Sequence, residues 1–116
     1  MELPPLPQAL ERLSGILPEF VAPSIHFSLD CSRTAKIGES KVGGQPDLPE
    51  GFEWPNSEYA TLDFLLQIDL AAVAPLDPLR ELPSSGLLSF FYDLHEQPWG
   101  FDPTENESWR RLLHFA

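Results

Sequence analysis

The sequence predicts an α+β domain: one N-terminal helix packed on a mostly antiparallel sheet of short strands, joined by long proline-rich loops. Two observations predict this class. Residues 5–17 carry apolar residues at helical spacing, whereas the later apolar runs are short and mostly alternate with polar residues. Thirteen prolines, about double the usual share, limit the length of every regular element. A chain of 116 residues fits one domain, residues 1–116.

The predicted helix covers residues 5–17. The prolines at its start suit a first helical turn, and Pro18 ends the helix because it cannot continue the backbone hydrogen bonds. The apolar residues would share one face, which would pack on the sheet. They are Leu6, Leu10, Leu13 and Ile16 or Leu17.

The first strand is predicted at residues 24–31, where apolar and polar residues alternate. Its apolar face comprises Ile25, Phe27, Leu29 and Cys31. Because Cys31 lies on that face, we expect it to be a small core residue.

Residues 40–55 are predicted to be ordered but irregular. The adjacent glycines Gly43 and Gly44 allow a positive φ, and three prolines exclude a helix. We therefore expect a glycine turn followed by an extended run. Three apolar side chains would hold this run against the sheet: Leu48, Phe52 and Trp54.

A second strand is predicted at residues 61–68, again from alternation. Its apolar face would consist of Leu62, Phe64, Leu66 and Ile68. Asp69 follows directly and can cap a short helix over residues 70–73, because its carboxylate can accept a backbone N–H of the first turn.

Two more strands complete the predicted sheet. Residues 86–92 are apolar on both faces, which predicts a central, buried strand. Residues 109–115 predict a final strand. Between them, residues 93–108 are polar and contain glycine and proline, so we expect a loop.

The charge of the chain excludes some classes of partner. The net charge is −11, from 18 acidic and 7 basic residues, and the acids are spread along the sequence. Binding to nucleic acid or to anionic membranes needs clustered Lys and Arg, so neither is expected. A basic protein would be attracted instead. The single cysteine, Cys31, and the absence of a secretory pattern at the N-terminus predict a cytoplasmic protein.

The order and spacing of motifs over residues 40–93 resemble those of the YwqG-like family, bacterial proteins gathered under a domain of unknown function. The motifs are Ser40-Lys41-Val42-Gly43-Gly44-x-Pro46-x-Leu48-Pro49, Trp54-Pro55, Phe64-Leu65-x-Gln67-Ile68-Asp69-Leu70 and Leu82-Pro83-x-x-Gly86-x-Leu88-x-Phe90-Phe91-x-Asp93. The resemblance implies an α+β fold with a largely antiparallel sheet and no particular activity, and it hints at an immunity-type role. Members of that family are commonly about twice as long. The resemblance therefore implies that this chain is an N-terminal half or a short variant.

Two sets of residues are candidates for a catalytic or metal site. Asp93, His95 and Glu96, with Asp102 beyond them, are metal-ligand types, but their spacing matches no zinc pattern and a solvated loop is favoured. Ser40 with His26 could form a nucleophile and its base, yet no Gly-x-Ser-x-Gly motif is present. No catalytic residue, metal or cofactor is therefore predicted, and an enzyme is not favoured.

The glycine pair and its neighbours have two possible roles. Gly43 and Gly44 could cradle a phosphate, but prolines rather than a helix follow them, which favours a structural turn. Gln67 should be buried and should satisfy backbone groups of residues 40–55, while Trp54 should wedge that segment onto the sheet. In the alternative, Lys41 and Gln67 would join these glycines and Trp54 in a binding site.

Three hypotheses for function follow. The favoured one is an acidic protein-interaction module that binds a basic protein, with an immunity-type role as one form of it. The alternative is a small-ligand-binding protein or enzyme with its site at Lys41, Gly43, Gly44, Trp54 and Gln67. The third is a structural half-domain that completes its sheet with a missing C-terminal half or with a second copy of the chain.

Overall fold

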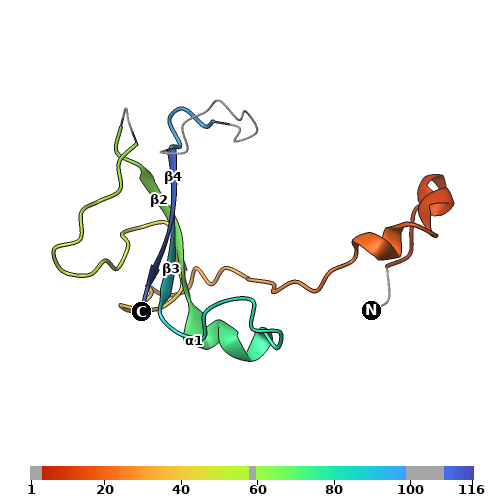
Figure 1. Ribbon diagram of the computed structural model, residues 1–116, viewed down its shortest axis with the longest axis horizontal. Helices are drawn as coiled ribbons and strands as arrows, with labels where there is room; N and C mark the ends of the chain where they lie inside the picture. The colour runs from red at the N-terminus through yellow and green to blue at the C-terminus, as the bar shows by residue number, and fades with distance from the viewer. Residues whose placement is uncertain (1–3, 58–59, 99–108) are drawn as a thin grey trace.

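The computed structural model describes residues 4–57, 60–98 and 109–116. Within them, four strands form one antiparallel sheet in the order β1-β2-β3-β4 (Figure 1). The strands are β1 (Lys41–Val42), β2 (Asp63–Asp69), β3 (Leu87–Tyr92) and β4 (Arg110–Phe115). The α-helix α1 (Leu70–Val73) and the 3-10 helix η3 (Ala74–Leu76) follow β2.

The predicted N-terminal helix is absent, so the predicted α+β class is wrong. Residues 5–17 instead hold the 3-10 helix η1 (Gln8–Leu13), and η2 (Leu17–Phe20) follows; neither contains a buried residue. Figure 1 shows this N-terminal arm, which we define as residues 4–36, extending away from the sheet. The radius of gyration is 18.2 Å, whereas a compact domain of this size would have about 13 Å.

The strand predicted at residues 24–31 is also absent. Alternation makes a strand only where a neighbouring strand offers backbone hydrogen bonds, and the arm has no such neighbour among the described residues. Phe27 and Leu29 consequently remain 61% and 74% exposed. Cys31 is exposed as well, so its prediction as a core residue is wrong.

The predicted positions of three strands and of the short helix are confirmed. Strands β2, β3 and β4 fall where alternation and apolar runs predicted them, and β3 is central between β2 and β4. Asp69 caps α1, because its carboxylate accepts the N–H of Ala71 at 3.1 Å. Of the predicted loop at residues 93–108, residues 93–98 contain no helix or strand, and 99–108 lie outside the described residues.

A bulge in β2 determines which side chains share a face. Phe64 pairs with Phe91 and Leu66 pairs with Phe90, so Leu65 is an extra residue with no counterpart in β3. The predicted grouping of Leu66 with Phe64 on one face is therefore wrong. Phe64 and Gln67 lie on one face of the sheet, and Leu66 lies on the other.

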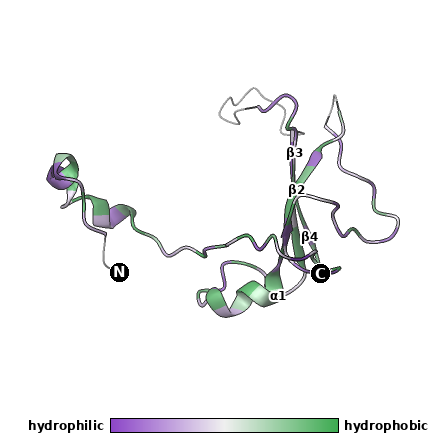
Figure 2. Cartoon of the chain, turned by 180° about the vertical axis from the view of Figure 1, so that it is seen from behind, coloured by the Kyte–Doolittle hydropathy of each residue, from purple (hydrophilic) through white to green (hydrophobic). Residues whose placement is uncertain are grey.

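One face is covered by the proline-rich segment, and we call it the covered face. Its core consists of Leu62, Phe64 and Phe91, against which Leu48, Trp54 and Leu113 pack. Figure 2 shows hydrophobic residues along β2 and over α1. The opposite face, which carries Leu66 and Phe90, is called the open face below.

Candidate functional site

The centre of the candidate site is the buried side chain of Gln67, which is 1% exposed. Its Oε1 accepts the backbone N–H of Asp47 at 3.0 Å, and its Nε2 donates to the Asp47 carboxylate at 2.7 Å and to the Glu39 carbonyl at 2.8 Å. These bonds join β2 to the two sides of the glycine turn. The predicted structural role of Gln67, satisfying the backbone of the irregular segment, is confirmed.

Asp47 is the second member of this cluster. Its carboxylate also accepts the backbone N–H of Gly38 at 2.9 Å and the Nζ of Lys41 at 3.3 Å. Burial raises the pKa of Asp47, but the hydrogen bonds from Gly38 and Gln67 and the charge of Lys41 outweigh it and lower the pKa below 3.8. We call Lys41, Asp47 and Gln67 the polar clamp.

The two glycines form the predicted turn. Gly43 and Gly44 have φ values of 72° and 73°, in the left-handed region that favours glycine. The N–H of Gly43 donates to the Leu65 carbonyl at 2.7 Å, which extends the pairing of β1 with the bulged part of β2. Because that N–H is already used, only part of the backbone here is available to an anion.

Trp54 acts as the predicted wedge. Its indole Nε1 donates to the Leu62 carbonyl at 2.6 Å, and its ring packs edge-on against Phe91 with centroids 5.5 Å apart. Trp54 thus fixes the far end of the proline-rich segment in the core, apart from the polar clamp.

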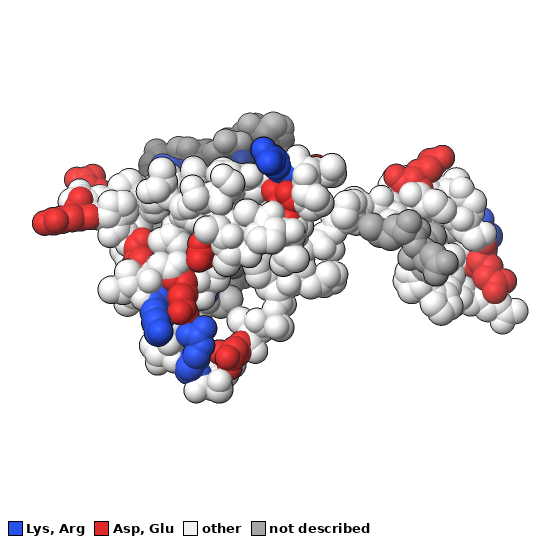
Figure 3. All heavy atoms as spheres, turned by 90° about the horizontal axis from the view of Figure 1, so that it is seen from below, with Lys and Arg blue, Asp and Glu red and all other residues white. Residues whose placement is uncertain are grey.

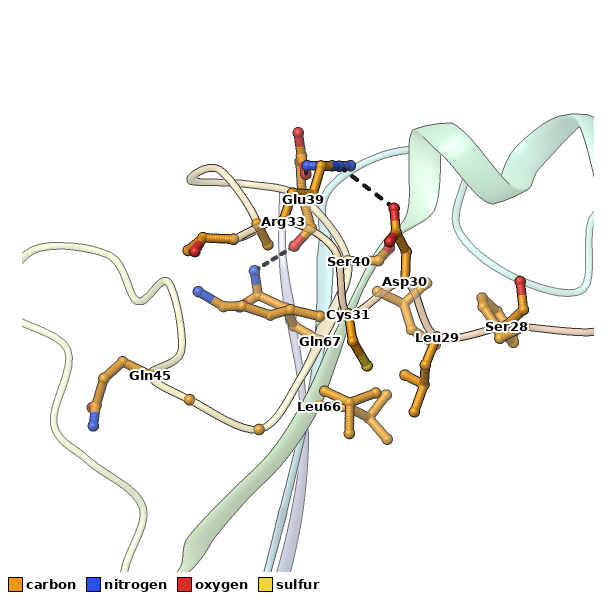
Figure 4. A pocket seen from close by; sticks show the side chains of 18 residues that line it. Ser28, Leu29, Asp30, Cys31, Arg33, Glu39, Ser40, Gln45, Leu66 and Gln67 are labelled. Carbon is orange, nitrogen blue, oxygen red and sulfur yellow. Dashed lines mark hydrogen bonds and ion pairs between the residues drawn. The ribbon is translucent and has the colours of Figure 1, made fainter.

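A groove lies between residues 27–35 of the arm and the β1–β2 edge of the sheet. Its volume is about 720 Å³, and it is lined by four of the five predicted binding residues but not by Trp54. Those four are Lys41, Gly43, Gly44 and Gln67. Figure 4 shows Leu29, Cys31 and Leu66 gathered in one part of this groove, with Arg33 and Glu39 together in another.

The polar side chains that line the groove are largely paired with one another. Arg33 donates to Glu39 at 2.7 Å, and Lys41 and Gln67 belong to the polar clamp. The apolar side chains of the lining are less well covered, since Phe27 and Leu29 are mostly exposed. The groove therefore offers apolar surface more than free hydrogen-bonding groups.

The open face carries an apolar row that the sequence reading missed. Cross-strand register places Val42 beside Leu66, Leu66 beside Phe90, and Phe90 beside Leu112, so one residue from each strand contributes. The two ends of the row, Val42 and Leu112, are 63% and 60% exposed. Only the strand register and the bulge reveal this row, because its members lie far apart in the sequence.

The remaining predicted sets do not come together. Asp93 is buried, and its carboxylate accepts the N–H groups of His95 and Glu96, so it shapes the turn after β3 rather than lying in a solvated loop. Asp102 lies outside the described residues. Ser40 donates no proton to His26: the Ser40 hydroxyl accepts the N–H of Asp69, whereas His26 lies beside Ser24 in the arm.

Acidic side chains are distributed over both the arm and the rest of the chain, which we call the body. On the face shown in Figure 3, the basic side chains of the body lie next to acidic ones. In the part of the chain that the structure describes, no helix is long and apolar enough to cross a membrane.

Comparison with models of known protein families gives a match. The profile of a family described as Domain of unknown function (DUF1963) matches residues 40–115. This range begins next to the polar clamp, includes all four strands and leaves out the N-terminal arm. No curated protein and no solved structure is similar enough to match.

Proposed function

This chain belongs to the DUF1963 family of domains of unknown function, and we propose that it is a protein-interaction module whose docking surface is the open face of the sheet. Within the family, the motifs over residues 40–93 support a YwqG-like assignment. Membership of this family implies no particular biochemical activity, so the proposal depends on the surface of this chain.

The observation that supports the proposal is the apolar row from Val42 to Leu112 together with the adjoining groove. The row crosses four strands and is exposed at both ends and half-buried in the middle. Apolar surface of this kind is typical of a binding surface, because water is released when another protein covers it. With strands about 4.8 Å apart, the row extends over about 14 Å. This length suits the apolar side of one partner helix or strand pair.

The charge of the chain supports a basic partner. A net charge of −11 attracts a basic protein over long distances and raises the rate of association, and salt screens this attraction. An immunity-type role, in which the module covers a basic partner in the cytoplasm, is the form of interaction that we propose.

Substitution of Val42 tests the docking surface. Tagged full-length chain would be used to capture proteins at low and at high salt, and each captured protein would then be purified and its binding measured directly. We expect a basic protein that binds the wild type, binds more slowly at high salt and binds Val42→Asp at least tenfold more weakly. Leu79→Asp is the matched control, because Leu79 is 71% exposed but lies outside the row.

Two results would contradict this proposal. One is the capture of no basic protein at low salt. The other is equal binding of a captured protein to the wild type and to Val42→Asp, which would place the docking surface elsewhere.

The groove supports a second candidate function, a small-ligand site or an enzyme. Its volume of about 720 Å³ lies within the range of known ligand pockets, about 300–1,000 Å³. The mutual pairing of Lys41, Asp47 and Gln67 weakens this candidate, because a ligand would have to displace those bonds. A thermal-shift screen of small metabolites that finds no stabilising compound would remove it.

A further inference from the structure

Strand β4 forms one edge of the sheet, and its backbone geometry is regular. The N–H of Asp93 donates to the Trp109 carbonyl at 2.9 Å. In an antiparallel pair, hydrogen-bonded and non-hydrogen-bonded positions alternate. The backbone N–H and C=O of Leu113 therefore point toward β3, whereas those of Leu112 and His114 point away from it. In the described part of the chain, no strand lies beyond β4.

We propose that a second copy of this chain pairs antiparallel with β4 along this edge, with a two-fold axis at Leu112. The inference goes beyond the proposed function, because it concerns the edge of the sheet rather than the partner on its open face. An unpaired edge strand can pair with other chains and cause aggregation. A symmetric dimer would instead pair this edge with one defined neighbour.

The backbone and the side chains together select the axis at Leu112. Only outward-directed positions can exchange hydrogen bonds with another strand, and these positions alternate along β4. Placing Leu112 opposite Leu112 of the second copy pairs outward positions with outward positions along the whole strand. Axes at the neighbouring residues do so too, but they would set Leu112 opposite Arg110 or His114, so only the Leu112 axis joins the two apolar rows. Moving one strand by one residue would pair outward with inward positions. It would also put the open face of one copy on the same side of the joined sheet as the covered face of the other.

The side chains of β4 agree with this register. Leu112 meets its own copy on the open face, so the two apolar rows join into one that runs from Val42 of the first chain to Val42 of the second. The arginines Arg110 and Arg111 lie at opposite ends of the joined strands in the two copies. Parallel pairing would instead bring like charges together, which is unfavourable.

A cysteine cross-link tests the axis directly. In the Cys31→Ser background, Leu112→Cys leaves one cysteine per chain. The two Cα atoms of an antiparallel hydrogen-bonded pair are about 5.5 Å apart, within the range of about 4.4–6.8 Å that a disulfide requires. We expect mild oxidation to convert most of this variant into a covalent dimer.

Two matched variants in the same background control the cross-link. Leu76→Cys replaces a leucine of similar exposure, 63% against 60%, that lies far from the edge. Arg110→Cys lies on the same strand, but its two copies would be about 14 Å apart at about 3.4 Å per residue. Neither should form a covalent dimer. Equal cross-linking of Arg110→Cys or Leu76→Cys would overturn the proposed register.

Mass measurement by light scattering tests the dimer without any covalent bond. We expect the full chain to approach twice its mass of 13.0 kDa as its concentration rises. Leu112→Lys places two charges opposite each other at the axis and should raise the dissociation constant at least tenfold, whereas Leu76→Lys should not change it. A wild type that stays monomeric at every concentration would overturn the inference.

These outcomes are separable from those of the proposed function. Val42→Asp should weaken the basic partner and leave the dimer unchanged, because Val42 lies on β1 at the other edge of the sheet. A dimer that fails to bind any basic protein would contradict the proposed function alone. A monomer that binds one would contradict this inference alone.

Discussion

Gln67 on β2 and Asp47 in the proline-rich segment are joined by two hydrogen bonds, one in each direction. The Asp47 N–H donates to Gln67 Oε1 at 3.0 Å, and Gln67 Nε2 donates to the Asp47 carboxylate at 2.7 Å. An amide is the side chain that can both accept and donate in this way. The pair therefore fixes a segment without regular structure to a regular strand, 20 residues away in the chain.

Two substitutions of Gln67 test its hydrogen bonds as acceptor and as donor to Asp47. Gln67→Leu leaves the Asp47 N–H and the Glu39 carbonyl without partners, so we expect a loss of about 1–3 kcal/mol in unfolding free energy. Gln67→Glu puts a second carboxylate against Asp47 and should be more damaging at pH 7. Urea unfolding at pH 7 and pH 4.5 measures both.

The two variants should differ in their response to pH. The deficit of Gln67→Glu should shrink at pH 4.5, since protonation of one carboxyl relieves the repulsion. The deficit of Gln67→Leu should stay nearly constant between the two pH values. A pH-independent deficit for Gln67→Glu would contradict the contact with Asp47.

Asp47→Asn should remove a pH-dependent part of the stability. The folded-state pKa of Asp47 lies below 3.8, because the hydrogen bonds from Gly38 and Gln67 and the charge of Lys41 outweigh the effect of burial. A lowered pKa contributes stability that is complete well above pH 3.8 and is lost as the pH falls through the folded-state value.

We expect Asp47→Asn to unfold about 2 kcal/mol more easily than the wild type at pH 7, because an amide N–H₂ would face other donors. The gap should close as the pH falls below 3.8. Unfolding free energies from pH 7 down to pH 3 measure it, and a gap that widens in acid would refute this account.

Trp54→Phe should cost about 1–2 kcal/mol in unfolding free energy. The change keeps an aromatic ring against Phe91 but leaves the Leu62 carbonyl without the donor that now lies 2.6 Å away. Trp54→Ala should cost more, about 3 kcal/mol, because it also empties part of the core. Equal losses for the two variants would mean that the hydrogen bond matters more than the ring.

Gly86→Ala should disrupt the pairing of β3 with β4. Gly86 has a φ of 95°, and an added Cβ would overlap the backbone oxygen of Phe115. Gly44→Ala is the control, since Gly44 has a similar φ of 73° but open space around it. We expect about 1 kcal/mol for the control from the backbone conformation alone and clearly more for Gly86→Ala, measured by thermal unfolding.

Local patterns predicted those parts of the fold that depend on local chemistry. Asp69 caps α1 because a carboxylate next to a short apolar run can reach the first free N–H. Alternating or clustered apolar residues predict strands β2 to β4. The burial of Gln67 was predicted because a lone amide between apolar residues needs buried partners.

The errors arise where a partner element decides the outcome. Helical spacing in residues 5–17 indicates a face to be buried, but Gly15 and the surrounding prolines weaken the helix and the described structure offers this segment no surface. Phe27 and Leu29 alternate as in a strand, yet no strand edge lies beside them. The apolar row needs the cross-strand register, which no single stretch of sequence contains.

The extra residue Leu65 has a consequence for how this protein can vary. It places Gln67 on the covered face and Leu66 on the open face. Deleting Leu65 would leave a regular strand with both residues on these faces, whereas a deletion after Gln67 would exchange polar and apolar surfaces from that point onward. Homologous sequences should therefore keep the length of β2 from Gln67 onward, whereas the bulge and the linkers on either side are free to change in length.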